Sequence, residues 1–249
     1  MSEVVVASYN VHQCRGVDGR RDPRRIAEVI HSLDAQVIAL QEVDSWPGPG
    51  AEPVQMEFLA HTVGLHAISG PTIERRDGHY GNALLTKLPI VEVRKLDLTV
   101  FRREPRGALD VRLDAGDATL RVIATHLGLL PSERRYQVQR ILETVEQDDR
   151  TVTVLLGDIN EWFVAARALR WLHARFGEGA GGRTYPSWLP LFKLDRIWVR
   201  PTTALGRFRV HVTPVTRRAS DHLPVSASIT VAAGAVQATD SIRPFAVRT

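Results

Sequence analysis

The sequence predicts a fold of the α/β (α+β) class, in which two β-sheets pack face to face and helices lie outside them. Ten or more segments have the pattern of strands and about four that of helices, and the helices interrupt runs of strands instead of alternating strictly with them. No stretch of the 249 residues resembles an interdomain linker. We therefore expect one domain over residues 1–231, followed by a loosely packed, Ala-rich tail over 232–249.

The strand around which the chain is organised lies in residues 151–160, TVTVLLGDIN. Its apolar, β-branched run has no polar alternation, which is typical of a strand buried on both faces. Asp158 and Asn160 follow at its end, and side chains two residues apart on extended backbone point the same way. Further strands are predicted over 4–11, 36–43, 66–69, 90–98, 107–113, 119–127, 194–199, 208–215 and 224–231.

Four segments have the features of helices. At the first of them Asp22 is a favourable N-cap and Pro23 a favourable first helical residue. Apolar residues at helical spacing follow in each segment, which gives every helix one face for the core. The predicted helices cover residues 23–33, 56–63, 131–145 and 161–176, and a Gly-rich loop follows the last of them.

Composition limits the classes of partner and compartment. The net charge of +4 and the pI near 9.6 favour an anionic partner, such as nucleic acid, a phosphorylated small molecule or a lipid headgroup, or else a solvated basic surface. The single cysteine, Cys14, excludes an internal disulfide and a thiolate metal cage. No apolar stretch reaches the roughly 18 residues of a membrane span, and the N-terminal segment has the pattern of a strand. We expect a monomeric, cytoplasmic protein without stable membrane insertion.

Polar residues end the apolar strands repeatedly along the chain. Each alone has an ordinary structural explanation, such as a turn cap for Asn10, a core histidine for His126 or an ion pair with Arg196 for Asp195. Together they supply carboxylates, carboxamides and imidazoles, the groups that bind a hard divalent cation and a phosphate. The set comprises Asn10, Glu42, Asn82, His126, Asp158, Asn160, Asp195, Asp221 and His222.

Eight motifs containing these residues follow one another along the chain. They are SYNVH (8–12), IALQEVD (38–44), YGNALLTKLPI (80–90), RGAL (106–109), THLG (125–128), LLGDIN (155–160), LDRIWV (194–199) and SDHLPV (220–225). In this order they resemble the endonuclease/exonuclease/phosphatase superfamily of deoxyribonuclease-like, metal-dependent phosphoesterases. The resemblance implies a four-layer α/β/β/α sandwich of two mixed β-sheets, with the active site at one edge.

The resemblance also implies a role for each position. Glu42 would be the principal ligand of Mg²⁺ or Mn²⁺, with Asn10 and Asp221 beside it. Asp158 would orient or deprotonate the attacking water. The remaining roles are a phosphate contact for Asn160, Asn82 and Arg106, a phosphate contact or acid/base for His222 oriented by Asp195, and stabilisation of the leaving oxygen for His126.

The substrate stays open at this level. His12 and His126 occupy positions where apurinic endonucleases carry other residues, which argues against abasic-site repair. A divalent-metal-dependent phosphodiesterase or phosphatase acting on a phospholipid headgroup or a small phosphoester is one hypothesis, and a nuclease acting on DNA or RNA is the alternative. A non-catalytic binding module is a third. Trp46 and Trp188 could stack on a base or meet a lipid, although buried packing is the commoner use of tryptophan.

Overall fold

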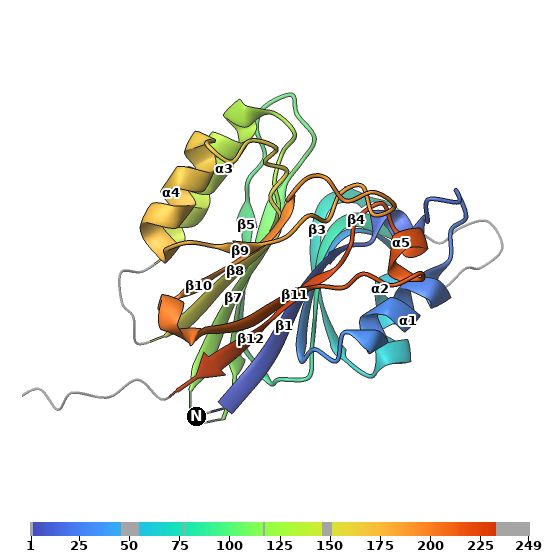
Figure 1. The fold of residues 1–249 in the computed structure, drawn as a ribbon, viewed down its shortest axis with the longest axis horizontal. Helices are drawn as coiled ribbons and strands as arrows, with labels where there is room; N and C mark the ends of the chain where they lie inside the picture. Colours follow the sequence, from blue (N-terminus) through green and yellow to red (C-terminus); the bar gives the residue numbers. More distant parts are fainter. Residues whose placement is uncertain (1, 46–54, 77, 117, 146–150, 233–249) are drawn as a thin grey trace, which may run out of the picture.

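Two six-stranded sheets form the centre of the molecule in the computed structural model, which describes residues 2–45, 55–76, 78–116, 118–145 and 151–232. The first sheet has the order β11-β12-β1-β2-β4-β3, and the second β5-β6-β7-β8-β10-β9 (Figure 1). Both are mixed, since β1 pairs in parallel with β2, and β7 with β8, among antiparallel neighbours. The strands of the first sheet are β1 (Ser2–Asn10), β2 (Val37–Ser45), β3 (His66–Arg75), β4 (Gly78–Thr86), β11 (Leu205–Val210) and β12 (Val225–Val231). Those of the second are β5 (Ile90–Asp97), β6 (Gly107–Asp114), β7 (Thr119–His126), β8 (Val152–Asp158), β9 (Ala180–Gly181) and β10 (Asp195–Arg200).

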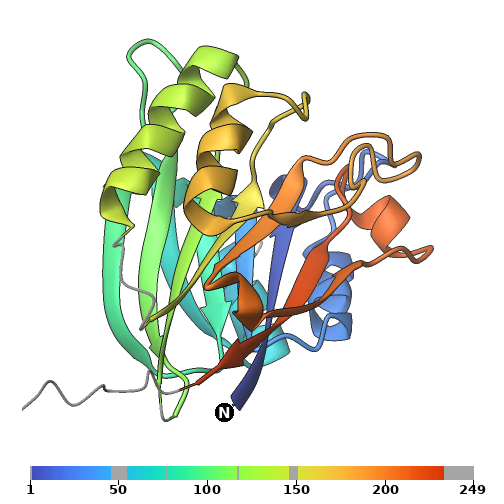
Figure 2. The ribbon, with the colours of Figure 1, turned by 60° about the vertical axis from the view of Figure 1, so that its left-hand side comes forward.

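Helices cover the two outer faces of this sandwich. One outer face carries α1 (Pro23–Ser32) and α2 (Gln55–Val63), and the other carries α3 (Pro131–Thr144) and α4 (Arg167–Phe176) (Figures 1 and 2). Asp22 caps α1 as predicted, because its carboxylate accepts a hydrogen bond from the Arg25 N–H at 3.1 Å. Short helices lie at η1 (His12–Cys14), η2 (Thr202–Ala204) and α5 (Thr216–Ala219). The predicted α/β/β/α sandwich is therefore confirmed.

Three apolar layers hold the sandwich together. The middle layer fills the space between the sheets and takes alternate residues of each strand, such as Val152, Val154 and Leu156 of β8. One outer layer joins the first sheet to α1 and α2, and the other joins the second sheet to α3 and α4. All seven residues of β8 are buried, as its unbroken apolar run indicates.

The rows of side chains between the sheets end in polar groups. Val4 and Val6 lie in the middle layer, and the same face of β1 continues to Asn10. In the second sheet Asp158 on β8 is the direct partner of His126 on β7 and of Asp195 on β10, and the other members of each row between the sheets are apolar. Strand register therefore places these three groups side by side at one end of the sandwich.

Three sequence predictions were wrong in extent. The helix predicted over 161–176 begins only at Arg167, because Asn160 adopts a left-handed conformation (φ 52°) and the buried Glu161 carboxylate accepts the Phe163 N–H. The strand predicted over 208–215 ends at Val210, and beyond it the Thr213 hydroxyl accepts the Thr216 N–H at 3.1 Å in the turn that leads into α5. The strand predicted over 66–69 is longer, since β3 continues to Arg75.

The chain ends of the predicted domain lie in the same sheet, where β1 pairs with β12. The tail predicted from residue 232 lies outside the described residues except for Ala232, as does Trp46. Among the residues that the structure describes, no helix combines the length and the apolar character needed to cross a bilayer.

Candidate active site

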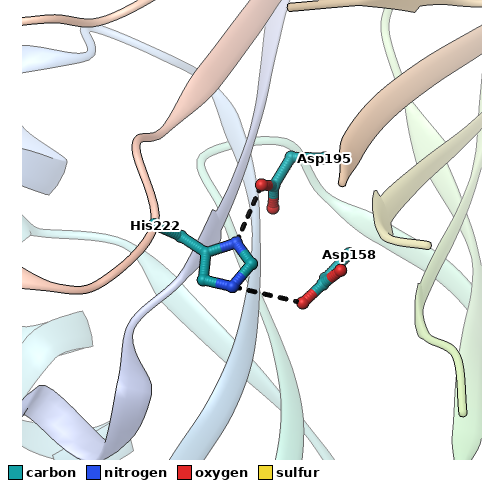
Figure 3. A group of neighbouring side chains, drawn as sticks. All are labelled: Asp158, Asp195 and His222. Carbon is teal, nitrogen blue, oxygen red and sulfur yellow. Dashed lines mark hydrogen bonds and ion pairs between the residues drawn. The ribbon is translucent and has the colours of Figure 1, made fainter. Parts of the chain in front are cut away.

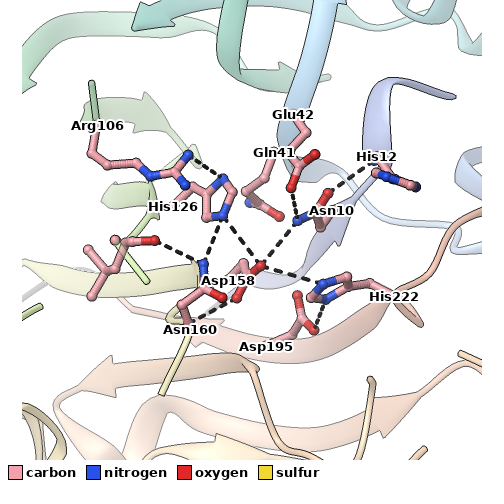
Figure 4. A network of polar contacts seen from close by, with 12 residues as sticks. Asn10, His12, Gln41, Glu42, Arg106, His126, Asp158, Asn160, Asp195 and His222 are labelled. Atoms are coloured by element: carbon pink, nitrogen blue, oxygen red, sulfur yellow. Dashed lines mark hydrogen bonds and ion pairs between the residues drawn. The ribbon is translucent and has the colours of Figure 1, made fainter. Parts of the chain in front are cut away.

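Asp158 lies at the centre of a polar network between the two sheets (Figure 4). Its Oδ2 accepts a hydrogen bond from Asn10 Nδ2 at 3.1 Å, and its Oδ1 accepts one from the backbone N–H of Asn160 at 2.9 Å. The sequence argument expected Asn160 to follow on extended backbone, whereas the left-handed turn at Asn160 closes this hydrogen bond. Asp158 is 1% exposed, so hydrogen bonds from the protein stabilise its carboxylate in place of bulk water.

His222 forms an ion pair with two carboxylates (Figure 3). Its Nδ1 lies 2.9 Å from Asp195 Oδ2, and its Nε2 lies 3.6 Å from Asp158 Oδ2. Burial alone would lower the pKa of His222, but the charges of Asp195 and Asp158 outweigh it and raise the pKa to about 10. At neutral pH His222 is therefore an imidazolium held between two acids.

His126 has the opposite protonation state. Burial is the larger cause and the positive charge of the Arg106 guanidinium the second, and together they lower the pKa of His126 to about 3. Its Nδ1 lies 3.3 Å from Arg106 Nη1 and its Nε2 lies 3.0 Å from Asn160 Nδ2, and a neutral ring accepts a hydrogen bond at one of these nitrogens and keeps its proton on the other. The site thus sets one neutral and one cationic imidazole on opposite sides of Asp158.

Glu42 reaches the network through an irregularity in β2. The register of β2 against β4 shifts between Leu40 and Val43, and Glu42 has φ 57°. Such a bulge redirects a side chain, and Glu42 Oε1 accepts a hydrogen bond from Asn10 Nδ2 at 2.9 Å. Asn10 thus turns its amide nitrogen to two carboxylates and its oxygen to the His12 N–H, 3.0 Å away.

A cavity of about 370 Å³ opens beside this network. Glu42 and Asp221 both line it, so these two predicted metal ligands lie on the same side of the molecule. Asp221 Oδ1 lies 3.6 Å from His12 Nδ1 and 3.3 Å from the Ser220 hydroxyl oxygen. Arg106, His126, Asp158, Asn160 and His222 line the cavity as well.

The charges around the cavity suit a cation. Four carboxylates line it, those of Glu42, Glu104, Asp158 and Asp221, against the guanidinium of Arg106 and the imidazolium of His222. Oxygen ligands of this kind are those that Mg²⁺ and Mn²⁺ prefer. A second candidate set, Asp158, Asp195 and His222, has ligand atoms within 4.8 Å of one another, but the His222–Asp195 hydrogen bond already occupies it. Glu42 and Asp221, which line the cavity, stay the predicted ligands of a divalent cation.

Asn82 and Asp195 lie behind the cavity instead of lining it. Asn82 is buried, and its Nδ2 donates to the Gly107 carbonyl of the opposite sheet at 3.0 Å, which ties the sheets together beside the site. Asp195 Oδ2 is hydrogen-bonded to His222, which does line the cavity. Of the ordinary explanations considered from the sequence, an ion pair of Asp195 with Arg196 is replaced by the contact with His222.

The sequence argument missed several residues around the cavity. Tyr185 packs against His222 with ring centroids 4.9 Å apart, and Glu104 pairs with Arg106 at 3.1 Å. Ser220 donates to the Asn10 carbonyl at 2.7 Å and so ties the loop before β12 to the end of β1. Tyr80 and Trp162 also line the cavity. Tyr80 and Ser220 gave a signal in the sequence, since each begins one of the ordered motifs, although neither was assigned a role.

Comparison with known proteins identifies the family. A model of the Endonuclease/Exonuclease/phosphatase family matches residues 7–222. The chain belongs to this family. Over 245 residues it is 30% identical to protein YbhP of Escherichia coli K12, an alignment that covers 90% of this chain and 95% of that protein.

Solved structures of family members have the same fold. An endonuclease/exonuclease/phosphatase from Beutenbergia cavernae DSM 12333 has a TM-score of 0.76 at 23% identity, with 95% of this chain and 73% of that chain covered. The mannosyl-6-phosphatase of Bacteroides thetaiotaomicron VPI-5482 has a TM-score of 0.74 at 18% identity, with 92% and 100% covered. The resemblance drawn from the ordered motifs is confirmed.

The charge state of His222 is open to direct measurement. We expect Asp195→Asn to lower the pKa of His222 in metal-free protein, because the variant removes the nearest of the carboxylate charges that raise it. A folded-state pKa above the ordinary value means that the imidazolium contributes stability below about pH 6.5. That stability is lost as the pH rises toward about 10.

Nuclear magnetic resonance titration of the His222 ring reports this pKa, and urea unfolding across the same pH range reports the stability. Asp114→Asn, at the exposed last residue of β6, is the matched control and should leave the His222 titration unchanged. An Asp195→Asn protein with the wild-type titration curve would show that the Asp195 charge is not what raises the pKa.

Proposed function

We propose that this protein is a divalent-metal-dependent hydrolase of phosphoester bonds. The observation that supports it most is the position of Asp158, an anion between a neutral and a cationic imidazole at the wall of a cavity that Glu42 and Asp221 also line. The endonucleases, exonucleases and phosphatases that give the family its description all hydrolyse phosphoester bonds.

The chain supplies groups for each part of an in-line displacement at phosphorus. Water attacks the phosphorus atom and the bond to the leaving oxygen breaks, so the reaction needs a positioned water, charge compensation at the phosphoryl oxygens and support for the leaving group. We assign to Asp158 the orientation of the water and the acceptance of its proton. A divalent cation held by Glu42 and Asp221 would supply Lewis acidity toward the phosphoryl oxygens.

The protonation states of His222 and His126 suggest which of them contacts the phosphoryl oxygens and which the leaving oxygen. The His222 imidazolium and the Arg106 guanidinium offer positive N–H donors to the phosphoryl oxygens, and Asn160 offers an amide. His126 is neutral, so we assign it a hydrogen bond at the leaving oxygen and not the donation of a proton. Asp195 keeps the His222 ring in place and charged. The monomeric state, the cytoplasmic location and the single-domain boundaries stay predictions from the sequence.

Removal and return of the metal test this proposal. We expect the hydrolysis of p-nitrophenyl phosphate or bis-p-nitrophenyl phosphate to stop in EDTA and to resume with Mg²⁺ or Mn²⁺. Glu42→Gln removes the charge of the principal ligand, so it should raise the metal concentration needed for half-maximal rate at least about tenfold. Glu28→Gln, on the exposed side of α1, should leave it unchanged.

A panel of DNA, RNA, phospholipid and sugar phosphate measured at the same metal concentration separates the substrate classes. Full activity after exhaustive chelation, or an unchanged metal requirement in Glu42→Gln, would contradict the proposed metal site. Turnover of polynucleotides alone would favour the nuclease alternative, and a folded protein that hydrolyses no member of the panel would favour a binding module.

A further inference from the structure

Exposed apolar side chains are concentrated around the mouth of the cavity. Of the sixteen large hydrophobic residues that are exposed in the described chain, ten lie on four loops that lead to or from cavity residues. These loops join β5 to β6, β7 to α3, β8 to α4 and β9 to β10, and all lie at the upper end of the molecule in Figure 2. A patch of this kind beside a functional site marks an interaction surface.

The most exposed of these residues on the last three loops form what we call the apolar rim. Their exposed fractions range from 50% for Leu189 to 79% for Val164. Trp188 is 62% exposed, so the buried packing that is usual for tryptophan does not apply to it. The apolar rim consists of Leu129, Phe163, Val164, Trp188, Leu189 and Leu191.

The apolar rim is held in place from beneath. Trp162 lines the cavity and packs edge-on against Phe192 and Tyr185, with ring centroids 4.7 and 5.6 Å apart, which joins two of the three loops. Arg217 Nη1 donates to the Trp188 carbonyl at 2.7 Å. Arg134 donates to the Leu129 carbonyl and, at 2.8 Å, to the Glu161 carboxylate next to Trp162. Fixed backbone thus presents these apolar side chains to solvent.

Basic residues accompany the rim. Arg183 and Lys193 are exposed on the loop that carries Trp188, and Arg102 and Arg103 are exposed beside Phe101, which is 83% exposed on the β5–β6 loop. The exposed acid on these same segments is Glu104, which pairs with Arg106. Four exposed cations and one paired acid around an apolar surface complement an anionic lipid surface.

We propose that the apolar rim docks this protein onto anionic phospholipid bilayers and brings the phosphate of a lipid headgroup to the cavity. The inference rests on the proposed phosphoester hydrolase and adds its substrate class. Leucine and valine side chains favour the acyl boundary of a bilayer over a polynucleotide, because they neither stack on bases nor bond to phosphates. The surrounding arginines and lysine meet the headgroup phosphates.

Vesicle binding tests the docking without any turnover. We expect the full chain to float with vesicles of phosphatidylcholine and phosphatidylglycerol and to bind pure phosphatidylcholine more weakly. Half-molar NaCl should weaken the binding, since it screens exposed charges. The double variants Phe163→Ser/Val164→Ser and Leu189→Ser/Leu191→Ser should each lower the partition coefficient at least about tenfold, because binding scales with the apolar area inserted.

A matched control uses apolar residues that are exposed elsewhere. Val91→Ser/Val93→Ser changes two exposed valines of β5, outside the apolar rim, and should leave vesicle binding unchanged. The rim variants should keep the wild-type rate on p-nitrophenyl phosphate and lose rate only on vesicle-borne phospholipid.

Other occupants give different results. Absence of vesicle binding, or equal binding by the rim variants, would overturn the inference while leaving the hydrolase proposal intact. If the protein does not bind vesicles but forms a dimer at high concentration that the rim variants dissociate, the rim binds a second copy of the chain. If it does not bind vesicles but binds DNA and the rim variants weaken that complex, the rim binds a polynucleotide. Either result would overturn the inference. Vesicle binding by a chain that hydrolyses no phosphoester would support the docking and contradict the hydrolase alone.

Discussion

Asp158→Asn is expected to lower kcat for a soluble phosphoester by about 10²–10⁴-fold, the range typical of a lost general base. The variant removes the negative charge between the two imidazoles but keeps an oxygen that can accept the Asn160 N–H. Turnover should therefore be lost while the turn and the fold persist. Steady-state kinetics at saturating metal, with circular dichroism of the same sample, measure both effects.

A matched control shows whether the loss of kcat depends on where the negative charge is removed or only on the change in net charge. Asp34→Asn removes one carboxylate at an exposed turn after α1, whose φ of 47° asparagine also tolerates. Its kcat should equal that of the wild-type protein. An Asp158→Asn protein that retains more than a tenth of the wild-type kcat would refute the role assigned to Asp158.

Arg134→Met is expected to lower the free energy of unfolding by about 3–5 kcal/mol. Arg134 and Glu161 are 1% and 2% exposed at their side chains, and two hydrogen bonds of 2.8 and 3.2 Å join them. The substitution leaves the Glu161 carboxylate buried without its counter-ion, which is the costly way to break such a pair. Urea unfolding monitored by tryptophan fluorescence measures the loss.

The double variant Arg134→Met/Glu161→Leu provides the control for this prediction. It removes both charges, and apolar replacement of a whole buried pair is often nearly neutral, so we expect it to recover at least half of the lost stability. If instead it is as unstable as the single variant, the hydrogen bonds of Arg134 to the Gly128 and Leu129 carbonyls account for the loss. The uncompensated charge would then be the wrong explanation.

Several features of the site followed from the sequence by itself. The apolar run that ends in Asp158 predicted a strand buried on both faces, and all seven residues of β8 are buried. Polar residues at the ends of apolar strands predicted His126 and Asp195 as companions of Asp158, and they are its partners in the register of the second sheet. Alternation of side chains along a strand is a local property of the backbone, so sequence spacing is sufficient to reveal it.

Only the tertiary structure decided how the polar groups meet. The β2 bulge brings Glu42 to Asn10, and the left-handed turn at Asn160 replaces the extended backbone that the sequence suggested. The pKa values of His126 and His222 move in opposite directions because of burial and the charges around each ring, which belong to segments far apart along the chain. The exposure of Trp188 likewise depends on how segments far apart along the chain pack together. Sequence determines which side chains share a face, whereas distance, desolvation and exposure depend on which other segments pack against them.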